Sequence, residues 1–297
     1  METTELLKKV RKIEIKTRGL SNQIFSGEYH AAFKGKGMAF SEVREYIPGD
    51  DIRAIDWNVT ARLNHPFVKV FEEERELCVM FLIDMSASGN FGTQKQFKRD
   101  LITELCAVLA FSAITNNDKI GVVFFTDTIE KFIPPKKGKS HILRIIRELI
   151  NFAPASKNTD ISQALRYFTN VIKKRSIAFV ISDFIDSKIQ NQNKVFEDAL
   201  KIASKKHDLV ALRIYDEREF YLPDMGLITL ADAETGNLTQ VDSSSKQIRK
   251  QYEMFARKNE TNLQNIFNKC GVDCASIRTD QNYVQPLIKL FKKREKR

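Results

Sequence analysis

The sequence has few cysteines and histidines, and neither type is grouped as metal ligands usually are. Its four cysteines, Cys78, Cys106, Cys270 and Cys274, form no Cys-x-x-Cys pair, and its four histidines are scattered along the chain. Cysteines in apolar or helical surroundings such as these are typical of reduced thiols. We therefore expect neither a disulfide framework nor a zinc site.

Long hydrophobic runs are also absent. No apolar stretch approaches the roughly 18 residues that a membrane span needs, and the N-terminus lacks the pattern of a secretory signal. With 42% hydrophobic and 29% charged residues, the composition is that of an ordinary folded protein. These absences predict a protein without a membrane span that is located in the cytoplasm.

Motifs of common catalytic sites are missing as well. No Gly-x-Ser-x-Gly elbow occurs, and Gly138-Lys139-Ser140 imitates a phosphate loop whose earlier glycine position holds Ile133. A Mg²⁺-dependent phosphoryl hydrolase with Asp84 as nucleophile is an alternative, but such phosphatases want a second aspartate where Ser86 stands. No residue is recognisable as a general base, so the sequence favours a protein that is not an enzyme.

The net charge of +10 is unevenly distributed. Residues 1–18 carry +3 and residues 289–297 carry +5, which leaves only +2 for everything between them. Basic runs at chain ends are more typical of solvated tails than of segments that recognise a nucleic-acid sequence, although they could contact acidic lipid, RNA or an acidic partner. A nucleic-acid binder acting through the basic termini is therefore a disfavoured alternative.

From residue 77 onward, strand and helix signals alternate. Apolar runs at 77–83, 120–125, 177–182 and 209–214 read as buried strands, and amphipathic segments lie between them. This alternation predicts an α/β fold with a doubly wound, mostly parallel sheet and helices on both faces. Residues 128–133 add a short hairpin partner, which we expect Pro134-Pro135 to stop.

The first 76 residues have a different pattern. A basic amphipathic helix is expected over residues 3–13, followed by a loop-rich region with glycines and an extended strand at 67–71. We therefore predict two parts. Residues 1–76 form a smaller N-terminal region rich in loops and β-structure, and residues 77–297 form the α/β domain.

Asp84, Ser86 and Ser88 follow the first apolar run at alternate positions. In open α/β sheets, ligands collect beyond the carboxyl ends of the strands, and Thr159 and Asp183 are expected at the same edge. An oxygen-only set of this kind suits Mg²⁺ or Mn²⁺ better than zinc. Alternatively, the first three of these residues merely cap the helix that follows the strand.

These five residues carry a resemblance to a known site. The Asp-x-Ser-x-Ser pattern, the later threonine before a helix and the aspartate after a strand resemble the metal-ion-dependent adhesion site of von Willebrand factor A domains. Residues 44–57, which include Gly-Asp-Asp-x-Arg-x-Ile-Asp-Trp at 49–57, resemble the bacterial family called domain of unknown function 58. The match runs from about residue 19 to 184. It departs at Lys157-Asn158, where relatives of the broader fold often have glycines.

The resemblance implies a von Willebrand A-like fold in which two serines and a threonine bind a divalent cation. The aspartates would act largely through water, and an open coordination position would accept a carboxylate from a protein partner. Proteins of this family are typically associated with MoxR-type AAA+ ATPases in the assembly or maturation of other proteins. We therefore expect a metal-dependent interaction protein, with such an ATPase or its substrate as the partner.

Overall fold

The structure is a computed structural model of the chain. It describes residues 38–73, 77–92, 96–185, 193–231 and 237–296, together with Val10, Arg11, Ile13, Glu14, Thr17, Tyr29, Ala32 and Phe33. The chain divides into two compact units. The larger unit comprises Met1–Phe33 and Cys78–Arg297, and the smaller comprises Lys34–Leu77.

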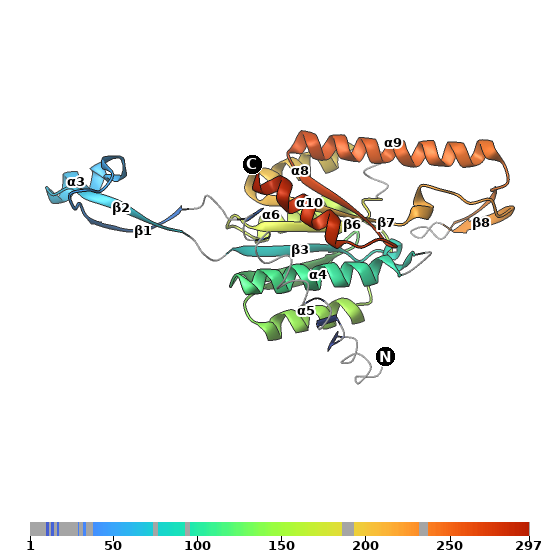
Figure 1. Cartoon of the computed structure of the whole chain (residues 1–297), viewed down its shortest axis with the longest axis horizontal. Helices are drawn as coiled ribbons and strands as arrows, with labels where there is room; N and C mark the ends of the chain where they lie inside the picture. The colour runs from blue at the N-terminus through green and yellow to red at the C-terminus, as the bar shows by residue number, and fades with distance from the viewer. Residues whose placement is uncertain are drawn as a thin grey trace. The chain divides into compact units, whose positions relative to one another are not determined.

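A six-stranded sheet forms the centre of the larger unit (Figure 1). In order across the sheet its strands are β10 (Asp273–Arg278), β7 (Asp208–Tyr215), β6 (Ile177–Ser182), β3 (Cys78–Asp84), β4 (Lys119–Phe125) and β5 (Ile129–Lys136). All neighbouring pairs are parallel except β4 and β5. The chain builds β4 and β5 on one side of β3 and then returns to place β6 on the other. The strand order therefore reverses at β3 and β6, which makes their carboxyl ends the switch point where ligands bind in such sheets.

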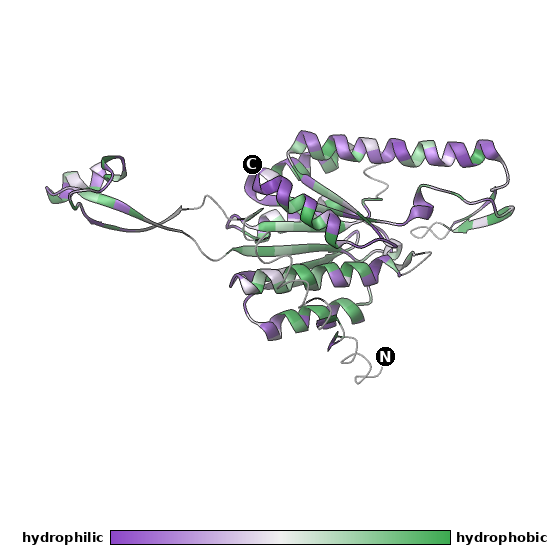
Figure 2. Cartoon of the chain, viewed as in Figure 1, coloured by the Kyte–Doolittle hydropathy of each residue, from purple (hydrophilic) through white to green (hydrophobic). Residues whose placement is uncertain are grey.

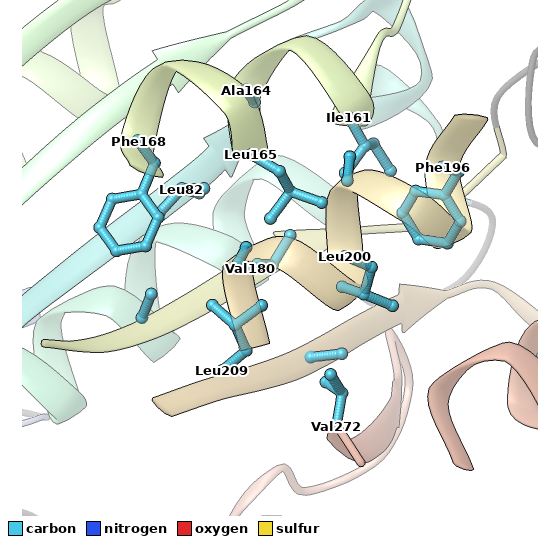
Figure 3. Close-up of a cluster of buried hydrophobic side chains, with 14 of the residues drawn as sticks. Leu82, Ile161, Ala164, Leu165, Phe168, Val180, Phe196, Leu200, Leu209 and Val272 are labelled. Carbon is cyan, nitrogen blue, oxygen red and sulfur yellow. The ribbon is translucent and has the colours of Figure 1, made fainter. Parts of the chain in front are cut away.

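Helices cover both faces of this sheet, as the sequence predicted. Successive side chains of a strand point to opposite faces, and one set packs against α6 (Ile161–Val171), α8 (Asn193–Lys206) and α9 (Lys246–Cys270) (Figure 3). Leu165 and Phe168 of α6 lie in this core with Leu82 and Val180 of the sheet. The other face is covered by α4 (Lys98–Thr115), α5 (Lys139–Asn151) and α10 (Val284–Glu295) (Figure 1). The predicted α/β architecture, a mostly parallel sheet with helices on both faces, is thus confirmed.

Hydropathy explains why the central strands form where they do. All residues of β6 are buried, and so are Val79 to Asp84 of β3. Figure 2 shows the central strands as hydrophobic, whereas most of α9 is hydrophilic. The buried residues of α9 are Leu263, Ile266, Phe267 and Cys270, all in its C-terminal third. Its N-terminal part follows a small antiparallel pair, β8 (Leu227–Ala231) and β9 (Leu238–Asp242).

The prediction that Pro134-Pro135 stops the hairpin partner was wrong, because β5 continues to Lys136. Proline is tolerated there because β5 is an edge strand of the sheet. The pairing with β4 shifts register beside Gly121. A Cβ atom at Gly121 would lie 2.9 Å from the Ile133 carbonyl oxygen and 2.6 Å from Met80 Sδ. Glycine therefore allows the close approach that keeps the proline-containing segment in the sheet.

The predicted division at residue 76 differs from the observed one. The N-terminal residues Tyr29 and Phe33 are buried in the larger unit, where the Phe33 ring lies 5.5 Å from Phe179 and 5.6 Å from Phe291. Long-range aromatic packing therefore joins residues 1–33 to the α/β unit. The helix expected over residues 3–13 falls largely outside the described residues.

The smaller unit is built on an antiparallel pair, β1 (Met38–Glu45) and β2 (Phe67–Glu73). The short helices η2 (Ile52–Ala54) and α3 (Trp57–Leu63) lie between these strands in sequence, and Asp51 and Asp56 cap them. Arg44 donates two hydrogen bonds of 2.7 Å to the carboxylate of Asp50, and this pairing holds the pKa of Asp50 below its usual range. The acidic residues of the Gly-Asp-Asp block thus fix turns and helix starts.

Candidate functional site

The candidate site lies where the strand order reverses. Asp84 is the last residue of β3, and Asp183 directly follows β6, its parallel neighbour. Both carboxylates are buried, with 5% and 4% of their surface exposed. Parallel neighbours end at the same edge of a sheet, so the two side chains emerge side by side. The structure therefore brings Asp84 and Asp183 together, as the sequence predicted.

Local hydrogen bonds fix the carboxylate of Asp84. The backbone N–H of Ser86 donates to Oδ1 over 2.9 Å, and the Ser182 hydroxyl donates to Oδ2 over 2.6 Å. Ser86 is buried and precedes a short helix, η3 (Ala87–Asn90). Its hydroxyl lies 3.0 Å from that of Ser88. The two serine hydroxyls and Asp84 thus form one compact group of oxygens. None of these side chains caps η3, so the alternative helix-capping role is not observed.

The threonine loop lies against this group through its backbone. The Ala87 N–H donates to the Lys157 carbonyl over 3.1 Å, so the segment at Lys157-Asn158, where glycines were expected, contacts the backbone between Ser86 and Ser88. Asp160 is the N-cap of α6 and accepts a bond from the Gln163 N–H. Because Asp160 does the capping, the Thr159 hydroxyl is left over. It is buried and has no hydrogen-bond partner among the described residues.

Lys98, which the sequence analysis missed, provides a buried cation beside Asp183. Its Nζ atom lies 2.8 Å from Asp183 Oδ2 and also pairs with Glu219 at the end of η4 (Glu217–Glu219). The Ile185 N–H donates to the other oxygen of Asp183 over 3.0 Å. Lys98 shares the buried face of α4 with Leu101 and Leu105. A lysine at that helical spacing was the signal that could have revealed it.

Burial and charge act differently on the two aspartates. Burial, reinforced by the negative charge of Asp183, raises the pKa of Asp84 to about 6. Burial also works to raise the pKa of Asp183, but the attraction of the Lys98 ammonium outweighs it and holds that pKa below its usual range. Lys98 thus favours the ionised form of Asp183. A second cation nearby would stabilise the ionised form of Asp84 and lower its pKa.

The backbone after Asp183 is held in an uncommon conformation. Phe184 has a φ of 58°, in the left-handed region that residues other than glycine, asparagine and aspartate rarely adopt. Its N–H donates to the Ser182 hydroxyl over 2.9 Å, and its buried ring packs against Phe267. Strain of this kind persists only where the surroundings enforce it, and it is concentrated at functional sites. Here it fixes the direction in which Asp183 leaves the sheet.

The donor set fits a hard divalent cation. Asp84, Ser86, Ser88, Thr159 and Asp183 offer only oxygen atoms, which Mg²⁺ and Mn²⁺ prefer. The Thr159 hydroxyl is buried and has no hydrogen-bond partner among the described residues, so its oxygen is available to a ligand. Together the three carboxylates, including Glu219, and the Lys98 ammonium carry two negative charges when ionised. Within the described ranges, no group of three or more His, Cys, Asp or Glu residues is placed to hold a metal, so a cation at this site would need hydroxyl ligands as well.

A pocket of about 220 Å³ opens beside Asp183. Its walls include the aromatic rings of Phe220, Tyr252 and Phe255, and its polar lining includes Arg213 and Glu260. Arg213 is largely buried and donates to Glu260 over 2.8 Å. The site is therefore bordered by a mixed aromatic and polar surface large enough for a side chain of another molecule.

Three proteins illustrate what the chain is similar to in sequence or in structure. "Uncharacterized protein Rv1480" of Mycobacterium tuberculosis (strain ATCC 25618 / H37Rv) is 27% identical over 298 residues, covering 100% of this chain and 92% of that protein. The crystal structure of an aerotolerance-related membrane protein from Bacteroides fragilis is similar with a TM-score of 0.51 and 17% identity, covering 74% of this chain and 98% of that one. A von Willebrand factor type A structure from Catenulispora acidiphila has a TM-score of 0.45 and 12% identity, covering 77% of this chain and 44% of that one.

The comparisons contradict the predicted cytoplasmic location. The Bacteroides fragilis protein of similar fold is described as a membrane protein, so this fold gives no ground for a cytoplasmic assignment, and we withdraw that prediction. In the part of the chain that the structure describes, no helix is both long enough and apolar enough to cross a bilayer.

The family assignment rests on a match across most of the chain. The profile of the family described as "Protein of unknown function DUF58" matches residues 42–262. The matched segment includes the aspartate-rich turns of the smaller unit and all five residues of the candidate site. The chain therefore belongs to the DUF58 family of proteins of unknown function.

Proposed function

We propose that the carboxyl edge of the sheet binds Mg²⁺ or Mn²⁺ and presents it to an acidic residue of a protein partner. The ligands would be Asp84, Ser86, Ser88, Thr159 and Asp183. The observation that carries this proposal is the Thr159 hydroxyl, which is buried without a partner among the described residues. Its loop is joined to the segment that holds Ser86 and Ser88 by the hydrogen bond from the Ala87 N–H to the Lys157 carbonyl. An unsatisfied buried hydroxyl costs about 1–3 kcal/mol, which a bound ligand would offset.

Each residue has a distinct part in this arrangement. The Ser182 hydroxyl and the Ser86 N–H orient Asp84, and the hydroxyls of Ser86 and Ser88 point toward each other. Lys98 keeps Asp183 ionised, so its remaining lone pairs can accept bonds from ordered water. A divalent cation bound there would supply a Lewis-acidic position open to a carboxylate.

The geometry supports binding better than hydrolysis. Both oxygens of Asp84 already accept hydrogen bonds, which makes it a positioned ligand and a poor nucleophile. Across the described residues, no specific observation favours the phosphoryl hydrolase alternative. The pocket beside Asp183, with its aromatic walls, supplies a surface on which a partner's side chain could rest next to its coordinating carboxylate.

The kind of partner follows from the family resemblance. A MoxR-type AAA+ ATPase, or a protein that it assembles or matures, is the candidate. Pull-downs should recover this partner with Mg²⁺ present, and lose it with EDTA or with Asp84→Ala. Equal recovery under all three conditions would contradict the metal bridge.

Metal binding can be tested without a partner by titrating Mn²⁺ into the full chain. Thr159→Val removes the unpartnered hydroxyl and keeps the shape of the side chain. We expect Mn²⁺ affinity to fall by about tenfold or more, while metal-free stability is unchanged or slightly raised. Thr169→Val is the matched control, because Thr169 donates its hydroxyl to the Leu165 carbonyl within α6. Equal Mn²⁺ affinities in the two variants would overturn the assignment of Thr159.

A further inference from the structure

The edge of the sheet opposite the candidate site carries an array of exposed basic side chains. The parallel strands begin at this edge, and the antiparallel β5 ends there. Nine exposed basic residues lie at strand starts, in the connections just before them or at the ends of elements there: Lys119, Lys136, Lys173, Lys174, Arg175, Lys205, Lys292, Lys293 and Lys296. They extend from β10 at one side to β5 at the other. Five strand spacings make this edge about 24 Å wide.

Two acidic residues at the strand starts of this edge are buried. Asp118 and Asp273 are 1% and 3% exposed. Arg294 of α10 binds both Asp273 and Asp208, which ties the basic end of α10 to the starts of β10 and β7. Among the described residues at these strand starts and helix ends, the exposed basic side chains therefore outnumber the exposed carboxylate of Glu295 nine to one. Counting charges along the sequence does not reveal this arrangement, because residues between the two basic ends are nearly neutral overall.

Exposed aliphatic side chains accompany the lysines. Val171 ends α6 just before Lys173 and is 38% exposed, and Ile202 of α8 is 60% exposed. Lys206 donates to the Thr169 carbonyl, so the ends of these two helices lie together. In the larger unit, the described aromatic residues with exposed rings lie elsewhere, in connections at the site edge or on α9: Phe91, Phe97, Tyr221 and Phe255.

We propose that this basic edge docks on a bilayer surface containing anionic lipid. Lysines near such a surface are attracted to it, each strengthening binding about fivefold. Aliphatic residues among them can enter the headgroup layer. Nucleic-acid readers use arginine forks and aromatic stacking platforms, whereas this edge has one exposed arginine in its array and no exposed aromatic ring among its described residues. The proposal does not depend on the metal site.

The test is cosedimentation of the full chain with vesicles of phosphatidylcholine alone or with one quarter phosphatidylglycerol. Wild-type protein should bind only the anionic vesicles. Lys173→Gln/Lys174→Gln/Arg175→Gln should weaken that binding by about tenfold or more. Lys246→Gln/Lys250→Gln/Lys258→Gln, which removes the same charge from exposed positions in the N-terminal half of α9, should weaken it less than about twofold.

Ile202→Ser distinguishes lipid from nucleic acid, because the net charge is unchanged. It should weaken vesicle binding a few-fold and leave binding to a 20-base-pair DNA duplex unaltered. Equal losses in the two triple variants, or no binding to anionic vesicles, would overturn the proposal. Tighter binding to the duplex than to the vesicles, with Ile202→Ser silent in both, would assign the edge to nucleic acid instead.

Discussion

The two edges of the central sheet differ in whether their charged side chains are buried or exposed to solvent. At the carboxyl edge, Asp84 and Asp183 are buried, and the cation that pairs with Asp183, Lys98, is buried with them. At the amino edge, Asp118 and Asp273 are buried, but an array of basic side chains remains in solvent. One strand topology therefore produces an enclosed, geometrically defined group of oxygens and, at the other end, an open positive surface.

This difference determines what each edge can recognise. Buried, hydrogen-bonded groups act in a low dielectric and discriminate by distance and coordination geometry. Exposed ammonium groups act through a field that salt screens within about 8–10 Å, so they select charge and little else. We therefore expect the carboxyl edge to govern specificity and the amino edge to govern where the protein accumulates.

The largest effect should come from removing the buried cation of the carboxyl edge. Lys98→Met leaves Asp183 and Glu219 buried without a compensating charge. Breaking a buried ion pair in this way costs about 3–5 kcal/mol. Urea unfolding at neutral pH should show a loss of that size. Millimolar Mg²⁺ should recover part of it, because the uncompensated carboxylates lie beside the proposed metal ligands.

Lys131→Met is the matched control for that substitution. Lys131 pairs with Glu148 at 2.7 Å, but both side chains are about one-third exposed. Surface pairs of this kind contribute about 0–1 kcal/mol. A loss for Lys98→Met no greater than for Lys131→Met would mean that the carboxyl edge is not the enclosed site described above.

A buried cation also exists at the amino edge, and its removal should cost somewhat less. Arg294→Met takes the partner from Asp273 and Asp208. We expect a loss of about 2–4 kcal/mol in urea unfolding, because Asp208 is partly exposed and Lys293 still lies 3.6 Å from Asp273. Mg²⁺ should give no recovery here. Recovery as large as in Lys98→Met would show that the metal effect is not specific to the carboxyl edge.

Much of the fold could be predicted from the sequence, because it depends on local patterns. Apolar runs without alternation identified the buried strands, and the amphipathic segments between them correspond to helices such as α6, whose Ile161, Leu165 and Phe168 are buried in the core. The role of Tyr29 and Phe33 could not be predicted, since Phe33 packs on Phe179, about 150 positions away in sequence, and Tyr29 packs on Phe291, still farther along the chain. The course of β5 through its prolines depended on Gly121, whose importance appears only when β4 and β5 are paired.

Some residues of the candidate site could likewise be predicted from the sequence, and others could not. Asp84, Ser86, Ser88, Thr159 and Asp183 all follow or precede regular elements, so the rule that parallel strands end at one edge brought them together. Lys98 and Glu219 were missed. The helical spacing of Lys98 with Leu101 and Leu105 could have indicated that it is buried, but no local pattern encodes its pairing with Asp183, 85 positions away. The sequence could thus predict the oxygen donors, but the charge balance around them required the structure.

The smallest effect is a pH dependence at the amino edge. His207 lies just before β7, only 1% exposed, with its ring 4.3 Å from Phe168 and neither ring nitrogen hydrogen-bonded within the described structure. Burial, with the nearby charges of Lys206 and Arg175, lowers the pKa of His207 to about 4.

In the unfolded chain this imidazole binds a proton near pH 6.5, whereas in the folded protein it does not until pH falls to about 4. Stability contributed by neutral His207 is therefore complete above pH 6.5 and is lost as pH falls through this window. Lys206 and Arg175 are partly or fully exposed, so solvent screens their charges and limits the loss to about 1–2 kcal/mol. Urea unfolding at several pH values should give a flatter profile for His207→Phe than for wild type, whereas His65→Gln, at an exposed position, should leave the profile unchanged. If the wild-type and His207→Phe profiles fall in parallel, the acid sensitivity arises from other groups, and the amino edge stabilises the fold without a titrating residue.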